Sequence, residues 1–140
     1  MKRLTLDSES FGLSSLMEKI TRVHVKDCFK GGEEGDTIYF VVAAAELGKA
    51  IGKGAVNIQK LQKDLNKKIR IIGYHDNVVD FVKSIIYPAK VEEIVQEGEV
   101  VFIKESNKKT KSLLIGRGGR NLKLINRAVQ RFFNVEIKIR

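Results

Sequence analysis

The sequence is poor in residues on which several classes of protein depend. Its 140 residues include one cysteine, one proline, two histidines and no tryptophan. Because a lone Cys28 cannot form an internal disulfide, we expect the protein in a reducing, cytoplasmic setting. No apolar run approaches the roughly 20 residues of a membrane span, and nothing resembles a signal peptide, so no membrane partner is expected.

Groupings of catalytic or metal-ligating side chains are also missing from the sequence. His24 and Cys28 lie four positions apart, but no second pair accompanies them. A histidine on a strand and a buried thiol are therefore favoured over a metal site. His75 has no nucleophile or acidic partner nearby in sequence, and no carboxylate cluster stands out. The sequence thus predicts a protein that is not an enzyme, with no cofactor, no metal and no small-molecule substrate.

Acidic residues are scarce in two stretches of an otherwise mixed-charge chain. Lys and Arg number 26 against 17 Asp and Glu, for a net charge of +9. Residues 49–70 hold seven basic residues and one acid, and residues 104–131 hold nine and one. Clustering of this kind is typical of proteins that bind polyanions. A solvated lysine-rich surface would be the simpler interpretation of a charge run alone, but both runs surround glycine-rich loops.

These loops lie 64 positions apart, and the sequence around them repeats. The first reads Ile51-Gly52-Lys53-Gly54-Ala55-Val56-Asn57-Ile58, and the second reads Ile115-Gly116-Arg117-Gly118-Gly119-Arg120-Asn121-Leu122. Residue type is kept without a gap at eight pairs of positions: Ile51/Ile115, Gly52/Gly116, Lys53/Arg117, Gly54/Gly118, Asn57/Asn121, Ile58/Leu122, Leu61/Ile125 and Leu65/Val129. Such a repeat predicts two copies of one structural unit, with its chemistry in the repeated loop.

The hydrophobic pattern predicts the same order of elements in both copies. In the first copy we expect a helix at residues 13–20, strands at 23–29 and 37–42 around a polar turn at 31–36, helices at 43–51 and 58–65, and a strand at 69–72 that Gly73 ends. In the second we expect a helix at 78–86 that stops before Pro88, strands at 91–95 and 99–103, helices at 105–115 and 122–129, and a strand at 135–139. Each copy reads α-β-β-α-α-β, so the predicted fold class is α+β.

Glycine in a loop between two helices allows a nucleic-acid backbone to come close. It adopts positive φ at little cost, and it has no Cβ to keep another chain away. Each loop leads into a helix N-terminus, where amide groups and the helix dipole favour phosphate. Lys53 and Arg117 add positive charge. Because phosphate contacts carry no sequence information, bases should be read beside the loops, against aliphatic side chains such as Ile51, Ile58, Ile115 and Leu122.

The strings Ala50–Ile58 and Leu114–Leu122 resemble the G-x-x-G core of KH domains, which clamp about four nucleotides of single-stranded RNA. The element order resembles the prokaryotic, type II form. Residues 68–72, 81–82 and 87–91 are similar to the join between the paired KH domains of NusA transcription factors. The resemblance covers nearly the whole chain and is to the short archaeal form, which lacks the polymerase-binding and S1 domains of bacterial members. It implies tandem type II KH domains at residues 1–75 and 76–140, each with a three-stranded sheet packed against helices.

The resemblance also implies a function. It points to a cytoplasmic protein that binds single-stranded RNA and acts in transcription termination, elongation or antitermination, with RNA polymerase as a further partner. The RNA-binding residues that it implies lie in and around the two loops: Lys49, Ile51, Gly52, Lys53, Gly54, Ala55, Asn57, Ile115, Gly116, Arg117, Gly118, Gly119, Arg120, Asn121 and Lys123. A KH protein of ribosome assembly or RNA decay, and a protein–protein adaptor with degenerate KH units, remain alternatives.

The first loop departs from the motif at Ala55, where glycine is expected, and at Val56, where the second loop has Arg120. A methyl group at Ala55 would crowd a phosphate or disfavour positive φ. We therefore expect the second loop to grip RNA more strongly. Phe132 and Phe133 could stack on bases, although a helix end meeting a core explains at least one of them better.

Overall fold

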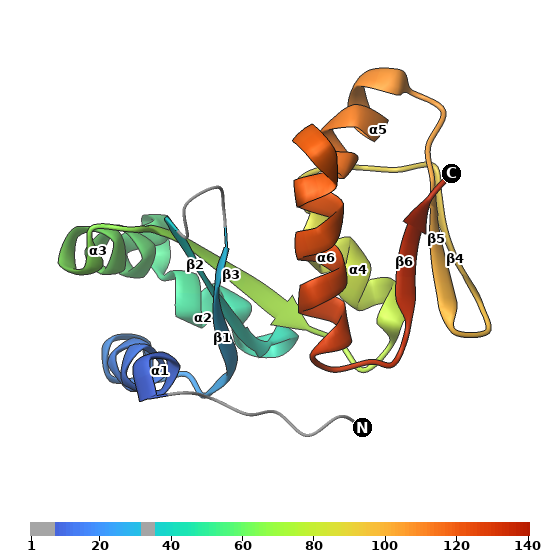
Figure 1. Ribbon diagram of the computed structural model, residues 1–140. Coiled ribbons are helices and arrows are strands. Elements are labelled where there is room, and N and C mark those ends of the chain that lie inside the picture. The colour runs from blue at the N-terminus through green and yellow to red at the C-terminus, as the bar shows by residue number, and fades with distance from the viewer. Residues whose placement is uncertain (1–7, 32–35) are drawn as a thin grey trace. The chain divides into compact units, whose positions relative to one another are not determined.

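The computed structural model describes residues 8–31 and 36–140, without the side chains of residues 8–11. The described residues fall into two compact units, which divide between His75 and Asp76. Each unit contains a three-stranded sheet and three α-helices in its described part (Figure 1). Most of the polar turn expected at residues 31–36 lies outside the described residues.

The first unit follows the predicted order of elements. Its helices and strands are α1 (Ser8–Thr21), β1 (Val25–Gly31), β2 (Thr37–Ala43), α2 (Leu47–Ile51), α3 (Val56–Leu65) and β3 (Lys68–Tyr74), with short 3-10 turns η1 (Ala44–Glu46) and η2 (Lys53–Ala55) on either side of α2. Strand β2 lies in the centre of the sheet, because it pairs antiparallel with β1 and parallel with β3.

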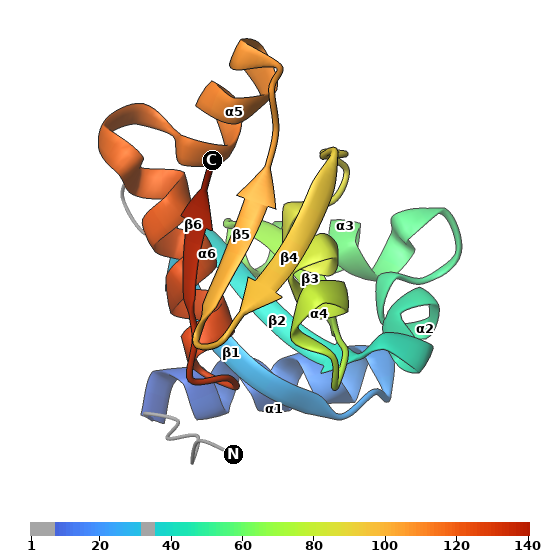
Figure 2. The same cartoon turned by 90° about the vertical axis from the view of Figure 1, so that its right-hand side faces the viewer.

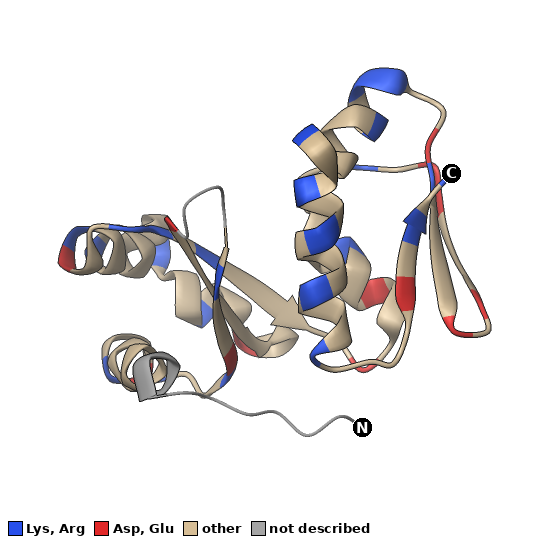
Figure 3. Ribbon diagram, viewed as in Figure 1, with Lys and Arg blue, Asp and Glu red and all other residues tan. Residues whose placement is uncertain are grey.

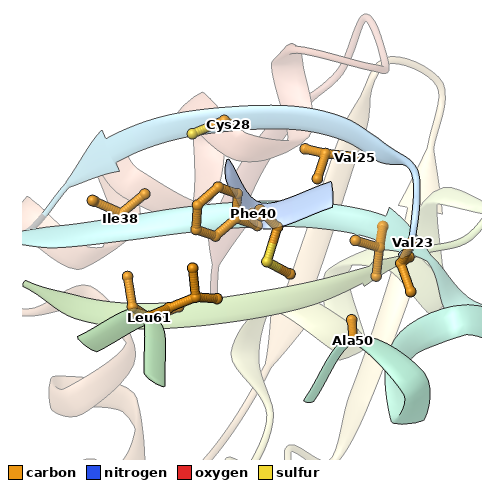
Figure 4. Close-up of a cluster of buried hydrophobic side chains, with 10 residues drawn as sticks. Val23, Val25, Cys28, Ile38, Phe40, Ala50 and Leu61 are labelled. Atoms are coloured by element: carbon orange, nitrogen blue, oxygen red, sulfur yellow. The ribbon is translucent and has the colours of Figure 1, made fainter. Parts of the chain in front are cut away.

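The core of the first unit lies between one face of this sheet and its three helices (Figure 4). Alternate residues of β2 enter the core, and Phe40 lies near its centre, fully buried. Each helix contributes a fully buried side chain: Met17 from α1, Ala50 from α2 and Leu61 from α3. Truncation of a leucine buried like Leu61 to alanine costs about 2–5 kcal/mol, so this cluster accounts for much of the unit's stability.

Strand β3 continues through Gly73, so the prediction that this glycine ends the strand is wrong. Gly73 is buried and pairs with Val42 of β2. A Cβ at Gly73 would lie only 3.3 Å from the Cα of Ala44. The glycine is therefore needed for a close approach of two backbones inside the fold, and not for a turn.

The second unit repeats the topology of the first. Its elements are α4 (Val78–Ile86), β4 (Glu93–Glu97), β5 (Val100–Lys104), α5 (Lys108–Ile115), η3 (Arg117–Gly119), α6 (Arg120–Gln130) and β6 (Glu136–Ile139). Strand β5 is central, antiparallel to β4 and parallel to β6. Figures 1 and 2 show α4 and α6 on one face of this sheet. The order α-β-β-α-α-β is thus observed in both units.

Both phenylalanines after α6 pack inside the second unit. The ring of Phe81, on α4, lies 5.5 Å from that of Phe132 and 5.9 Å from that of Phe133, between centroids. Phe132 is buried and Phe133 is half-buried. These contacts bear out the interpretation that the end of the helix meets a core. Because the ring of Phe132 is buried, it is not accessible for stacking on a base.

Helix α5 begins at Lys108, three residues later than predicted, because Asn107 caps it. The side-chain oxygen of Asn107 accepts a hydrogen bond from the backbone N–H of Thr110 at 3.0 Å. Asn77 caps α4 in the same way, accepting from Val79 at 2.9 Å. Such caps satisfy amide groups that the first turn of a helix leaves without partners.

Two carboxylates fasten the start of α5 to the segment before β4. Glu105 is buried, and its oxygens accept the backbone N–H of Glu92 at 3.0 Å and of Asn107 at 3.1 Å. Glu92 in turn accepts the backbone N–H of Ser106 at 3.1 Å and the Ser106 hydroxyl. These bonds from Ser106 hold the pKa of Glu92 below its ordinary value.

His24 and Cys28 have different surroundings. The His24 side chain is exposed, with its Nδ1 3.0 Å from Glu18 Oε2, whereas Cys28 is buried among the core residues of the first unit. Among the residues with described positions, no group of three or more His, Cys, Asp or Glu side chains is placed to hold a metal ion. None of the described helices has the length and apolar character required to cross a membrane.

Candidate nucleic-acid interface

The two glycine loops share one backbone conformation. Gly52 ends α2 with φ 82° and ψ 159°, and Gly116 ends α5 with φ 75° and ψ 169°. Two residues later, Gly54 has φ 64° and ψ 24°, and Gly118 has φ 63° and ψ 20°. The repeat in the sequence is therefore also a repeat in dihedral angles, at positions where positive φ favours glycine.

Ala55 adopts positive φ in the first loop despite its side chain. It has φ 60° and ψ 27°, close to the φ 77° and ψ 12° of Gly119 in the second loop. A left-handed conformation costs a residue with a Cβ roughly 1–2 kcal/mol. The methyl group therefore does not change the turn, but it makes the first loop the more strained of the two.

The glycines of each loop differ in what a side chain would meet. A Cβ at Gly52 would lie 2.9 Å from Val56 Cγ1, and a Cβ at Gly116 would lie 2.8 Å from the backbone N of Asn121. A Cβ at any of the other loop glycines would meet nothing within 4 Å: Gly54, Gly118 and Gly119. The first glycine of each loop thus serves internal packing, whereas the later ones leave an open surface for another molecule.

Backbone hydrogen bonds within each loop form its turn, and a helix follows the turn directly. In the first loop, the N–H of Ala55 bonds to the Gly52 oxygen at 3.0 Å, and the N–H of Val56 bonds to the Lys53 oxygen. In the second, the N–H of Gly119 bonds to the Gly116 oxygen at 3.1 Å. Helices α3 and α6 follow without a break, so the amide groups of their first turns lie next to the glycines.

Exposed basic side chains accompany both loops: Lys49 and Lys53 in the first unit, and Arg117, Arg120 and Lys123 in the second. Figure 3 shows basic residues along α5, the loop and α6 in the second unit. Half of the acidic residues of that unit lie away from α5, the loop and α6, on β4, on β6 and in the turn between β4 and β5: Glu93, Glu97, Glu99 and Glu136. Positive charge is therefore concentrated at the loop end of this unit.

Aliphatic and basic side chains exchange places between the two loops. Leu113 on α5 is 69% exposed, and its counterpart in the repeat is Lys49. Val56 on α3 is 55% exposed, and its counterpart is Arg120. Each loop therefore has one exposed aliphatic and one exposed basic neighbour, on opposite helices. Leu113 and Val56 were not among the predicted site residues. An alignment of the two repeats would have pointed to both positions, because it pairs each of them with a basic residue.

The structure gathers the predicted site residues of each unit around its own loop. Four aliphatic side chains beside the loops are half-buried and so keep part of their surface accessible: Ile51, Ile58, Ile115 and Leu122.

The side chains of Asn57 and Asn121 turn toward the protein. Asn57 Nδ2 donates to the Lys49 oxygen at 3.2 Å, and Asn121 Nδ2 donates to the Leu114 oxygen at 2.9 Å.

Comparison with known proteins shows the family to which the fold belongs. The family model of the KH domain matches residues 14–95, more than half of the chain. The crystal structure of APE1850 is similar with a TM-score of 0.75 and 29% sequence identity, and the match covers 96% of this chain and 100% of that one.

Several similar proteins have names that refer to transcription termination. The probable transcription termination protein NusA of Methanocaldococcus jannaschii is 29% identical over 99% of this chain and 76% of its own length. The protein of the same name from Methanococcus vannielii is 32% identical, over 91% of this chain and 72% of its own length. The transcription termination/antitermination protein NusA of Borreliella burgdorferi is 33% identical over 58% of this chain, which matches only 17% of that longer protein. The chain therefore belongs to the KH-domain family of RNA-binding proteins, and within it to the archaeal NusA-like members.

Proposed function

We propose that the chain binds single-stranded RNA through the glycine loops of two tandem type II KH domains, residues 1–75 and 76–140. The observation that carries this proposal is the open backbone at Gly54 and Gly118. Both have positive φ, a side chain at either would meet no atom within 4 Å, and each follows an exposed basic residue. Family membership and the same element order in both units support it further.

The proposed mechanism is capture of the RNA backbone at a helix N-terminus. A phosphate comes close to the glycines because no Cβ keeps it away, and amide groups that the loop's own hydrogen bonds do not use, at the N-terminal side of α3 or α6, donate to it. Lys53 or Arg117 adds a charge-assisted contact. Bases then lie against the half-buried aliphatic side chains beside each loop. A KH domain holds about four nucleotides in this manner.

Binding that depends on phosphates weakens as salt is added, because counterions are released from the RNA. With roughly four to six phosphates neutralised, the logarithm of the association constant falls against the logarithm of salt concentration with a slope of about −3 to −4. A flat salt dependence contradicts the proposal.

Fluorescence anisotropy with short labelled oligonucleotides tests RNA binding directly. Single-stranded RNA is titrated with the wild-type chain and with the double variant Arg117→Asp, Gly118→Asp, and DNA of the same sequence serves as a control. Lys138→Asp, on β6 and outside the loops, controls for the loss of positive charge. We expect the loop variant to bind at least tenfold more weakly, and the control to bind within about twofold of wild type.

We further propose that RNA binding serves transcription termination or antitermination, with RNA polymerase as a partner. The names of the similar proteins support this role. Transcription of a terminator template by an archaeal RNA polymerase, with and without the protein, measures the fraction of transcripts that read through. A fraction that the protein does not change would favour a role in ribosome assembly or RNA decay, and an absence of RNA binding would favour a protein–protein adaptor.

A further inference from the structure

We propose that Asn57 and Asn121 are positioning residues, which act on RNA binding by holding the glycine loops in their RNA-binding shape. This inference rests on the proposed function of the loops. Each asparagine lies in the first turn of the helix after its loop, at matching positions in the two repeats. Their role is assigned from three observations on their side-chain amides.

The first observation is that both amides reach back across the loop by the same number of residues. Asn57 Nδ2 donates to the backbone oxygen of Lys49 at 3.2 Å, eight residues earlier. Asn121 Nδ2 donates to the oxygen of Leu113 at 3.3 Å, also eight residues earlier. These carbonyls belong to the last turn of α2 and of α5, where a helix leaves oxygens without intrahelical partners. Each bond therefore ties the helix before the loop to the helix after it.

The second observation is that the first glycine of each loop makes room for the asparagine. A Cβ at Gly52 would lie 3.0 Å from both Cγ and Nδ2 of Asn57. A Cβ at Gly116 would lie 2.8 Å from Cβ of Asn121. Glycine and asparagine thus form an interlocking pair in both units, and this pairing explains why both positions keep their residue type in the repeat.

The third observation concerns the donors that remain. A side-chain amide has two N–H groups, and Asn121 directs its nitrogen at two carbonyl oxygens, Leu113 at 3.3 Å and Leu114 at 2.9 Å. An amide oxygen placed there would face two carbonyl oxygens, which fixes the orientation of the amide. Asn121 therefore has no N–H left for a phosphate, and its remaining oxygen is an acceptor that a phosphate does not bind.

A tie of this kind matters because the loop itself is permissive. The turn depends on three consecutive residues, Arg117 to Gly119, of which two are glycines with many accessible conformations. Fixing the loop before RNA arrives lowers the entropic cost of binding. Asn57 has one carbonyl partner among the bonds of the first loop where Asn121 has two, so the second loop is held more firmly.

Asn121→Ala in the full chain tests the proposal with two measurements, RNA affinity by anisotropy and amide hydrogen exchange of Gly119 by NMR in the free protein. The Gly119 amide reports on the loop because it bonds to the Gly116 oxygen, so we expect affinity to fall about tenfold and exchange at Gly119 to speed up in the absence of RNA. Lower affinity with an unchanged free loop would show a direct RNA contact and overturn the proposal. Unchanged affinity with faster exchange would overturn it as well, since the tie would then not matter for binding.

Asn126→Ala is the matched control, because it removes a structural asparagine from the same helix. Asn126 bonds to the Leu122 oxygen within α6 and to the Ile137 oxygen of β6, and not to the turn at residues 116–119. We expect it to lower the melting temperature while hydrogen exchange at Gly119 and RNA affinity stay as in the wild type. If Asn121→Ala does not fold, the same measurements are made on Asn121→Ser, which keeps a hydrogen-bond donor on a shorter side chain. Should the wild-type chain fail to bind RNA, the proposed function fails, while hydrogen exchange in the free protein still decides whether the amide holds the loop.

Discussion

Ala55 and Gly119 occupy the same position in the two glycine loops and the same left-handed region of backbone conformation. The agreement shows that the path of the loop is set by what surrounds it, because alanine does not favour this region. It also gives the two loops different energies, since only the first contains a residue with a Cβ there.

Replacing Ala55 with glycine should therefore stabilise the first unit, although glycine also increases the entropy of the unfolded chain. The relief of strain is roughly 1–2 kcal/mol and the entropic loss roughly 0.4–1 kcal/mol, so the net gain is about 0.5–1 kcal/mol. By the same two opposing effects, Gly119→Ala should lower the stability of the second unit by about 0.5–1 kcal/mol. Urea unfolding followed by circular dichroism measures both changes in the free energy of unfolding. A loss of stability in Ala55→Gly would contradict the proposal that Ala55 is strained.

The two loops should differ in their contribution to RNA binding. Exchanging Arg117 and Gly118 for Asp removes a cation and an open glycine from the loop that also has Arg120 and an unstrained Gly119. The same exchange at Lys53 and Gly54 should cost less, and we expect the ratio of the two affinity losses to be about three to ten. Titration of the same labelled RNA with both double variants gives this ratio, and equal or reversed losses would refute the ranking.

A single substitution should strengthen the first loop. Val56 is exposed at the position where the second loop has Arg120, so Val56→Arg adds a cation beside the first loop without disturbing a core. One further phosphate contact should steepen the salt slope by about 0.7 and raise affinity severalfold at low salt. Val56→Gln, which is of similar length but uncharged, is the control and should leave the slope unchanged. An identical slope in the arginine variant would place this side chain outside the RNA path.

Lowering the pH should weaken the hydrogen bonds by which Glu92 stabilises the start of α5. Hydrogen bonds from Ser106 lower the pKa of Glu92 in the folded protein below the ordinary value of 4.5. A lowered folded pKa gives stability that is complete above pH 4.5 and is lost as the pH falls through the folded value. The difference in melting temperature between wild type and Glu92→Gln should therefore shrink between about pH 6 and about pH 3. A difference that does not depend on pH would mean that the charge of Glu92 has no part in this contact.

The sequence predicted the order of the helices and strands because apolar residues recur at the spacing of each element. It failed where a single side chain decides a boundary. Helix α5 starts after Asn107 and not at Glu105, because the asparagine caps the helix while the glutamate is used by neighbouring backbone groups. Gly73 lies inside a strand because of a contact with Ala44, which is distant from it in the sequence.

The loops themselves could be predicted, since the repeat marks their glycines and the charge runs mark their surroundings. The role of Asn57 and Asn121 could not be predicted, because their partners are backbone carbonyls eight residues away. Every residue has a backbone oxygen, so the residue type at the partner position does not reveal the contact. The exposure of Leu113 was also hidden, because a leucine in an amphipathic helix is more often buried than exposed.

The most direct test of RNA capture by the loops is an NMR titration of the full chain with a short single-stranded RNA. The amide signals of Gly54, Gly118 and Gly119 should shift strongly at low RNA concentration, together with those in the first turns of α3 and α6, while signals of the core strands β2 and β5 stay in place. If the loop signals stay unchanged while RNA binds elsewhere on the chain, the glycine loops are not where this protein holds RNA.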